Sequence, residues 1–86
     1  MRDKVKVVLY TKPGCGLCDK MKAEMQNAGI EELYSLEEVN IETDAELLAQ
    51  YRYEIPVLLI NGVEAFRYRL SADEFRTHVT SLLKRD

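Results

Sequence analysis

A pair of closely spaced cysteines constrains this chain more than any other feature. The stretch TKPGCGLCDK (11–20) holds both cysteines of the sequence, Cys15 and Cys18, directly after a Lys-Pro-Gly turn. A redox pair, one half of a metal site and a small structural disulfide are all compatible with this spacing. A bridge between residues so close together closes a very short loop and restricts the unfolded chain little. The structural disulfide is therefore the weakest of the three interpretations.

Composition predicts one globular domain over residues 1–86. Hydrophobic residues make up 47% of the chain and charged residues of both signs 31%, a balance that argues against disorder. The net charge of −3 argues against a general nucleic-acid or anionic-membrane binder. The longest apolar run, IPVLLI (55–60), is too short to cross a bilayer. We therefore expect no nucleic-acid or membrane partner.

The first residues, MRDKVKVVLY (1–10), interleave charges with valines and show no secretory pattern. We therefore expect a cytoplasmic protein. We also expect a monomer. In the cytosol, paired cysteines are more often catalytic, redox-active or metal-binding than structural.

The N-terminal half predicts strand, helix, strand. The β-branched run VKVVLY (5–10) is typical of a buried strand and ends at the Lys-Pro-Gly turn. The run SLEEVNI (35–41) predicts a second strand. Between them, apolar residues at steps of three, four and three predict a helix that stops near Gly29: Cys18, Met21, Met25 and Ala28.

The C-terminal half predicts helix, strand, strand, helix. Residues 43–46 have the form of a capping box with Thr43 as its first residue, and predict a short helix. IPVLLI predicts a third strand, Asn61-Gly62 a hairpin turn, and VEAFRYRL (63–70) a fourth strand. A second capping box, Ser71 to Glu74, begins a closing helix.

The resulting order, β-α-β-α-β-β-α, predicts an α/β fold with a four-stranded mixed sheet flanked by three helices. Two cysteines in a C-x-x-C spacing beside a βαβ pattern are typical of a thioredoxin-like redox site.

The helical spacing distinguishes the two thiols. Cys18 shares a face with Met21 and Met25, so it should point inward, whereas Cys15 should lie exposed where the helix begins. Helix N-termini favour anions, and thiols there ionise with pKa values of about 3.5–7.5, against about 8.5 for free cysteine. A thiolate at Cys15 would therefore be stabilised.

Basic residues surround the cysteines, whereas residues 31–46 carry seven acids and no bases. Lys12, Lys20 and Lys22 together predict a modest positive potential at the thiols. Each lysine taken alone is also compatible with an ordinary solvated surface.

Pro56 interrupts an apolar strand pattern. A proline is unfavourable within a strand because it lacks a donor for the ladder. It fits better at a strand start or in a cis turn. In a thioredoxin-like arrangement the Ile55–Pro56 bond would be cis and opposite the cysteines, and an ordinary trans proline at a strand edge is the alternative.

The segments LYTKPGCGLC (9–18) and EIPVLLING (54–62) resemble the opening strand with the active-site turn, and the cis-proline strand with its hairpin, of the glutaredoxins. The likeness to this family of the thioredoxin-fold superfamily runs from Val5 to Leu83. It implies that Cys15 is the nucleophile and Cys18 the resolving thiol.

The resemblance also implies a substrate site. Lys12 would lie near the bound thiol substrate, and Ile55 and Pro56 would form a backbone platform. Gly16 and Leu17, between the cysteines, complete the expected substrate-binding set.

The chain departs from typical glutaredoxins in two places. Gly16-Leu17 replaces the usual Pro-Tyr, and Gly16 loosens the first helical turn. The Gly-Gly that lets backbone approach a glutathione carboxylate is replaced within FRYRLSADEF (66–75). Arg67 or Arg69, with the helix start at Ser71, would bind that carboxylate instead, unless both arginines simply face solvent. The chain in this respect resembles the small glutaredoxin-like proteins.

The activity implied is that of a dithiol thiol–disulfide oxidoreductase acting on protein disulfides or glutathione mixed disulfides. No metal or organic cofactor is required, glutathione is a candidate co-substrate, and glutathione or thioredoxin reductase would supply the electrons.

Two other functions remain open. A metal-binding module would use the cysteines as half a site, but zinc wants four ligands and only His78 and carboxylates remain; an iron–sulfur cluster shared by two subunits is the version that the resemblance suggests. A protein-interaction module would use the cis-proline edge without turnover.

Overall fold

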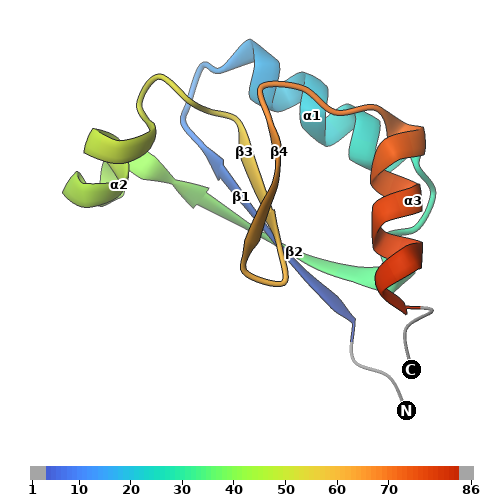
Figure 1. The fold of residues 1–86 in the computed structure, drawn as a ribbon. Helices are drawn as coiled ribbons and strands as arrows, with labels where there is room; N and C mark the ends of the chain where they lie inside the picture. Colours follow the sequence, from blue (N-terminus) through green and yellow to red (C-terminus); the bar gives the residue numbers. More distant parts are fainter. Residues whose placement is uncertain (1–3, 84–86) are drawn as a thin grey trace.

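The computed structural model describes residues 4–83 and confirms the predicted α/β architecture (Figure 1). Short 3₁₀ turns at Glu31–Leu33 and Ile41–Thr43 flank the second strand. The regular elements in chain order are β1 (Val5–Thr11), α1 (Gly16–Asn27), β2 (Tyr34–Asn40), α2 (Ala45–Tyr51), β3 (Val57–Ile60), β4 (Val63–Arg67) and α3 (Ala72–Leu83).

The four strands form one mixed sheet in the order β2-β1-β3-β4. β1 runs parallel to β2 and antiparallel to β3, and Val7 lies opposite both Leu36 and Ile60. β3 and β4 form the predicted hairpin, in which Asn61 and Gly62 both have positive φ angles of 53° and 82°. Two consecutive positive φ angles are the mark of a type I′ turn, which explains the Asn-Gly pair.

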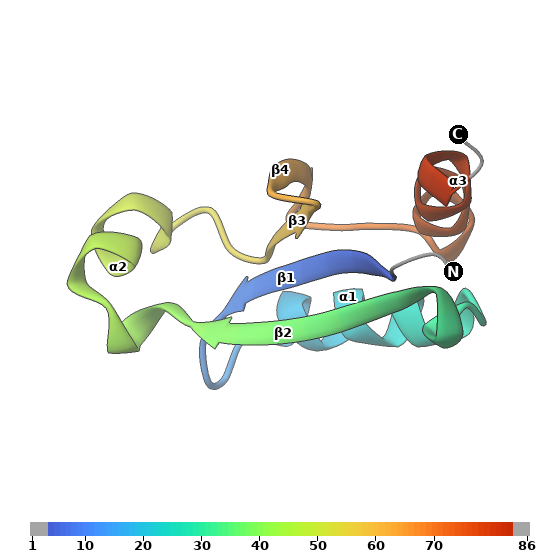
Figure 2. The same cartoon turned by 90° about the horizontal axis from the view of Figure 1, so that it is seen from below.

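One face of the sheet forms the main core with α1 and α3. Leu9 of β1, Met21 and Met25 of α1 and Phe75 of α3 are fully buried there. Tyr34 packs edge-on against Phe75, with 5.1 Å between the ring centroids. α2 lies apart from this core, at the opposite end of the sheet from α3 (Figures 1 and 2).

A second, smaller cluster lies where α2 approaches the start of α1. Cys18, Ile41 and Ile55 are its buried members. Partly buried residues pack around them: Tyr10, Cys15, Leu47, Leu48 and Tyr51. The cysteine turn therefore rests on its own apolar support, separate from the main core.

Three sequence-based boundaries were wrong. The third strand begins at Val57 rather than at Ile55, because the cis Ile55–Pro56 bond precedes the ladder. Asp44, rather than Thr43, caps α2, because the Asp44 carboxylate accepts the N–H groups of Glu46 and Leu47, while the Thr43 hydroxyl donates to the Asn40 carbonyl. The fourth strand ends at Arg67 rather than continuing to residue 70, because Tyr68 has a φ of 72° and turns the chain out of the ladder. The cap at Ser71 is confirmed: its hydroxyl accepts the Glu74 N–H at 3.1 Å.

No helix among residues 4–83 combines the length and the apolar character needed to span a bilayer.

The Asp44 cap can be tested by paired substitutions. We expect Asp44→Ala to lower the free energy of unfolding by about 1 kcal/mol, because it leaves two N–H groups of α2 without their acceptor. Thr43→Ala removes an exposed hydroxyl that donates to the Asn40 carbonyl but accepts no N–H of α2, and serves as the control. Urea unfolding of both variants measures the difference. An equal or larger loss of unfolding free energy in Thr43→Ala would indicate that Thr43, not Asp44, caps α2.

The burial of Tyr34 predicts that the free energy of unfolding falls at alkaline pH. Burial, with a smaller contribution from Glu31, raises the pKa of Tyr34 above the ordinary value of 10.0. A raised pKa means that the folded state favours the neutral phenol. The stability that the neutral Tyr34 contributes is therefore fully present below pH 10, and it is lost as the pH rises through the pKa of the folded state. We expect Tyr34→Phe to flatten the fall in unfolding free energy above pH 10. Tyr53→Phe, at a ring that is 81% exposed, should leave that fall unchanged.

Candidate active site

The two cysteines lie at the turn that joins β1 to α1. Gly14 has a φ of 78°, a conformation that favours glycine, and the next residue, Cys15, is the N-cap of α1. Cap residues have extended backbone and side chains that turn back over the first helical turn. The Lys-Pro-Gly turn thus places the Cys15 side chain at the N-terminus of the helix.

Cys15 and Cys18 are joined as a disulfide, with their Cα atoms 5.3 Å apart. The Cys18 backbone N–H donates to the Cys15 sulfur at 3.2 Å. The Cys15 sulfur therefore occupies the position of a capping oxygen, where the unpaired N–H groups of a helix concentrate positive potential. This contact is the direct geometric basis for stabilising negative charge on that sulfur.

The two sulfurs differ in access, as the helical spacing predicts. Cys18 is 1% exposed and faces Ile41 and Ile55. Cys15 is only partly buried at the rim of the same cluster, so it is less exposed than expected. Gly16 and Leu17, between them, are exposed. An incoming molecule reaches Cys15 before Cys18.

The Ile55–Pro56 peptide bond is cis, as the thioredoxin-like arrangement predicts. Both residues precede β3, so their backbone lies outside the strand ladder. Ile55 packs against Cys18 in the second cluster. The structure thus brings the predicted platform to the cysteine turn.

A polar clamp fixes the segment before the cis proline to the end of β4. Glu54 pairs with Arg67, which also pairs with Glu64. The Tyr68 hydroxyl donates to the Glu54 carboxylate at 3.3 Å, and the Tyr68 N–H donates to the Pro56 carbonyl at 2.8 Å. The hydrogen bond to Glu64, opposed in part by burial, raises the pKa of Arg67. Arg67, a candidate ligand for a substrate carboxylate, already holds two carboxylates of its own chain.

The start of α3 is similarly occupied. The Ala72 N–H donates to the Glu24 carboxylate of α1 at 2.9 Å, and the Ser71 hydroxyl accepts the N–H of Glu74. Ser71, another candidate for carboxylate binding, is therefore engaged in the cap of its own helix. Arg69, the third candidate, is exposed and lines a groove beside α1.

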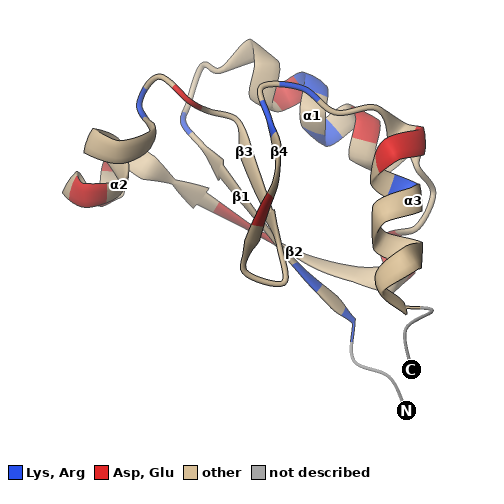
Figure 3. Ribbon diagram, viewed as in Figure 1, with Lys and Arg blue, Asp and Glu red and all other residues tan. Residues whose placement is uncertain are grey.

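The lysines near the cysteines differ in their surroundings. Lys22 pairs with Glu38 at 3.2 Å and lies 3.9 Å from Asp19, so its charge is balanced locally. Lys12 and Lys20 are exposed and make no ion pair with any residue between 4 and 83. Basic segments of α1 and of the β4–α3 connection lie near the same end of the sheet (Figure 3). Of the three lysines, Lys12 and Lys20 are therefore the two whose charges are not paired with a carboxylate among residues 4–83.

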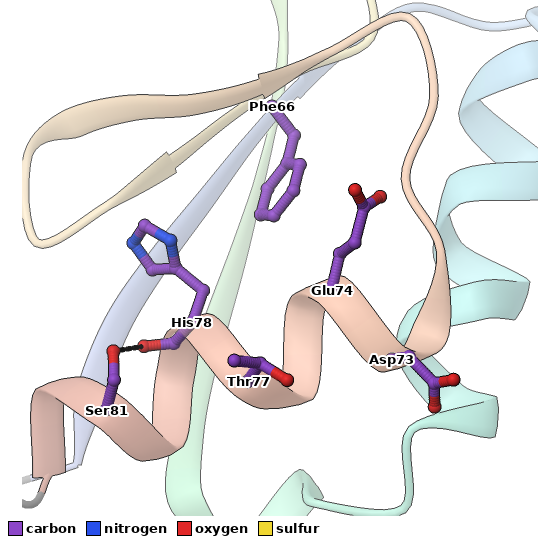
Figure 4. Close-up of a pocket in the computed structure, with 6 residues that line it drawn as sticks. All are labelled: Phe66, Asp73, Glu74, Thr77, His78 and Ser81. Atoms are coloured by element: carbon purple, nitrogen blue, oxygen red, sulfur yellow. Dashed lines mark hydrogen bonds between the residues drawn. The ribbon is translucent and has the colours of Figure 1, made fainter.

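His78 lies away from the cysteines, in a hollow between β4 and α3 (Figure 4). Its ring contacts Phe66 edge-on at 5.8 Å, and its carbonyl accepts the Ser81 hydroxyl. Within residues 4–83 no three side chains of His, Cys, Asp or Glu converge as a metal site would require.

Comparison with known proteins shows the family. The sequence profile of the glutaredoxin-like domain (DUF836) matches residues 6–80. The chain belongs to this glutaredoxin-like family. It is 23% identical to the Dictyostelium discoideum protein called glutaredoxin-like protein YDR286C homolog, over 93% of this chain and 80% of that one.

Solved structures agree on the thioredoxin fold. Protein Ne2328 from Nitrosomonas europaea superposes with a TM-score of 0.74 at 28% identity, covering 91% of this chain and 94% of that one. Chloroplastic thioredoxin z also gives a TM-score of 0.74, at 16% identity, over 95% of this chain and 80% of that one. A glutaredoxin-like thioredoxin fold with a close cysteine pair supports a redox role in general terms.

Sequence reasoning missed three residues around the site. Glu24 caps a helix 48 residues further along the chain, Glu54 holds the cis-proline segment to β4, and Tyr68 adopts a left-handed conformation. The contacts of Glu24 and Glu54 span long sequence separations and leave no local pattern. For Tyr68, the only signal was its place where glutaredoxins carry Gly-Gly.

The asymmetry of the thiols predicts ordered alkylation. In the reduced protein at pH 6.5, we expect iodoacetamide to modify Cys15 well before Cys18, because Cys15 is accessible and its thiolate accepts a helix N–H. Peptide mass mapping at short times measures both sites. In guanidinium chloride the two thiols should react alike, and equal rates in the folded protein would contradict the assignment.

Proposed function

We propose that this protein is a dithiol thiol–disulfide oxidoreductase in which Cys15 is the nucleophile and Cys18 the resolving thiol. The observation that carries the proposal is the position of the Cys15 sulfur, which accepts the Cys18 N–H at the start of α1 while Cys18 lies buried behind it. The disulfide between them represents the oxidised form.

The reaction begins with the reduced protein. The Cys15 thiolate attacks one sulfur of a substrate disulfide, a Cys15–substrate disulfide forms, and the other substrate sulfur leaves as a thiolate that takes a proton. The N–H of Cys18 stabilises the attacking thiolate before this step.

The second step releases the substrate. Cys18, as its thiolate, attacks the Cys15 sulfur and displaces the remaining substrate sulfur, which also leaves as a thiolate and takes a proton. The substrate disulfide has gained two electrons and become two thiols, and the protein dithiol has become the Cys15–Cys18 disulfide. A thiol reductant, glutathione or a thioredoxin reductase system, returns the two electrons.

Substrate placement follows from the surroundings of the cysteines. The backbone of Ile55 is outside the ladder and would support the chain that carries the target disulfide, beside Pro56, whose carbonyl already accepts the Tyr68 N–H. Lys12, Gly16 and Leu17 flank the approach of that chain. Protein disulfides and glutathione mixed disulfides are both candidate substrates for this arrangement.

The test compares wild type with Cys15→Ser and Cys18→Ser in the reduction of a mixed disulfide between glutathione and a small thiol. We expect Cys15→Ser to reduce the substrate no faster than the uncatalysed exchange, because the nucleophile is gone. Cys18→Ser should accumulate a mixed disulfide at Cys15 that intact-mass analysis detects. The same assay with an oxidised protein as substrate, recycled by thioredoxin reductase, separates the two substrate classes.

Either of two results would contradict the proposal. One is a Cys15→Ser variant that keeps wild-type turnover with both substrates. The other is a wild-type protein that turns over neither substrate although dithiothreitol reduces its Cys15–Cys18 disulfide.

A further inference from the structure

A groove of about 430 Å³ begins at Leu17, the residue before Cys18, and runs along α1. α1 forms one wall, and the connection from β4 to α3 forms the other. The residues that matter here are Leu17, Lys20 and Glu24 on α1, and Tyr68 and Arg69 on the connection.

The rim of the groove nearest the cysteines is apolar and open. Leu17 is 46% exposed and Tyr68 is 44% exposed, and both line the same groove. Exposed large apolar side chains that gather at one concave site indicate a surface for binding.

Tyr68 is held at this rim at a conformational cost. Its φ of 72° lies in the left-handed region, which is unfavourable for a residue other than glycine. The N–H bond to the Pro56 carbonyl and the hydroxyl contacts to Glu54 and the Tyr53 carbonyl offset that cost and fix the ring. A bulky aromatic kept where glycine would be unstrained indicates that the ring itself has a role.

The lining of the groove carries a net positive charge, with Lys20 and Arg69 against one carboxylate, Glu24. Lys20 and Arg69 make no ion pair with any residue between 4 and 83, in contrast to Lys22, Arg67 and Arg76. The one carboxylate in the lining, Glu24, accepts the Ala72 N–H at the start of α3. The two cations are therefore available to a negative group from outside.

We propose that this groove binds the polypeptide segment that flanks the target disulfide, with an acidic side chain of the substrate at Lys20 and Arg69 and an apolar side chain between Leu17 and Tyr68. This inference rests on the proposed oxidoreductase function and specifies its substrate class. Charge complementarity selects an acidic segment, and the apolar rim selects a neighbouring apolar residue.

A polypeptide fits these observations better than a small carboxylate thiol. The N–H groups of Ala72 and Glu74 at the start of α3 are already taken by Glu24 and Ser71, and Arg67 holds Glu54 and Glu64. A carboxylate placed at the start of α3 or at Arg67 would have to displace these groups, whereas a segment that extends along the groove reaches Lys20, Arg69 and the apolar rim without displacing any of them.

The experiment uses three short peptides, each with one cysteine next to a leucine and joined through a disulfide to 2-nitro-5-thiobenzoate. The peptides differ only in two flanking residues, which are Glu, Gln or Lys. Attack by Cys15 on the peptide sulfur releases the yellow thiolate, so absorbance gives the second-order rate constant. The rate of each peptide with dithiothreitol corrects for its intrinsic reactivity.

We expect the full-length reduced protein to react with the acidic peptide about tenfold faster than with the neutral one at low salt, and slowest with the basic one. Raising the ionic strength should reduce the differences between the three rate constants. Lys20→Glu and Arg69→Glu should each lower or invert the preference. Lys6→Glu is the matched control, because Lys6 is exposed on β1 far from the cysteine turn and the change in net charge is the same; it should keep the wild-type preference.

Equal corrected rates for the three peptides, or an unchanged preference in Lys20→Glu and Arg69→Glu, would overturn the groove assignment. So would a glutathione–thiobenzoate disulfide that reacts as fast as the acidic peptide, since a tripeptide would then suffice. Failure of the underlying function is distinguishable: in that case no peptide reacts faster with wild type than with Cys15→Ser.

Discussion

The rest of the site depends on the contact between the Cys15 sulfur and the N–H of Cys18. That contact exists because a turn with Gly14 at positive φ ends β1 and lets Cys15 cap α1. The same helix turns Cys18 into the apolar cluster with Ile41 and Ile55. One local geometry therefore gives two chemically identical side chains different access and different surroundings.

The cysteines pack against a second apolar cluster that is separate from the main core. α2 lies at the far end of the sheet, and its residues Leu47, Leu48 and Tyr51 pack toward Cys18 and Ile55. Tyr51 also contacts Tyr10 of β1, with 4.9 Å between their ring centroids. The short helix thus stabilises the cysteine turn and the cis-proline segment at the same time.

The segment between β4 and α3 distinguishes this chain from the glutaredoxin pattern in physical terms. Where glycines would leave backbone open to a ligand, Arg67 and Tyr68 bind Glu54 and Pro56, and Glu24 occupies the start of α3. The open surface that remains is the groove with Leu17, Lys20 and Arg69. In the binding mode that we propose, the substrate is recognised by side chains rather than by backbone N–H groups, which suits a larger substrate.

The sequence by itself determined the order of the elements, the hairpin at Asn61-Gly62, the inward direction of Cys18 and the helix start at Ser71. Each of these follows from local periodicity or from the conformational preference of one or two residues. It misplaced the cap of α2 by one residue and the end of β4, because neighbouring polar residues compete for the same N–H groups and because tertiary contacts hold Tyr68 at positive φ. Only the tertiary structure decided that Glu24 and Arg67 are occupied while Lys20 and Arg69 remain available. Those partners come from distant parts of the chain, and which charges meet depends on how α1, β4 and α3 pack together.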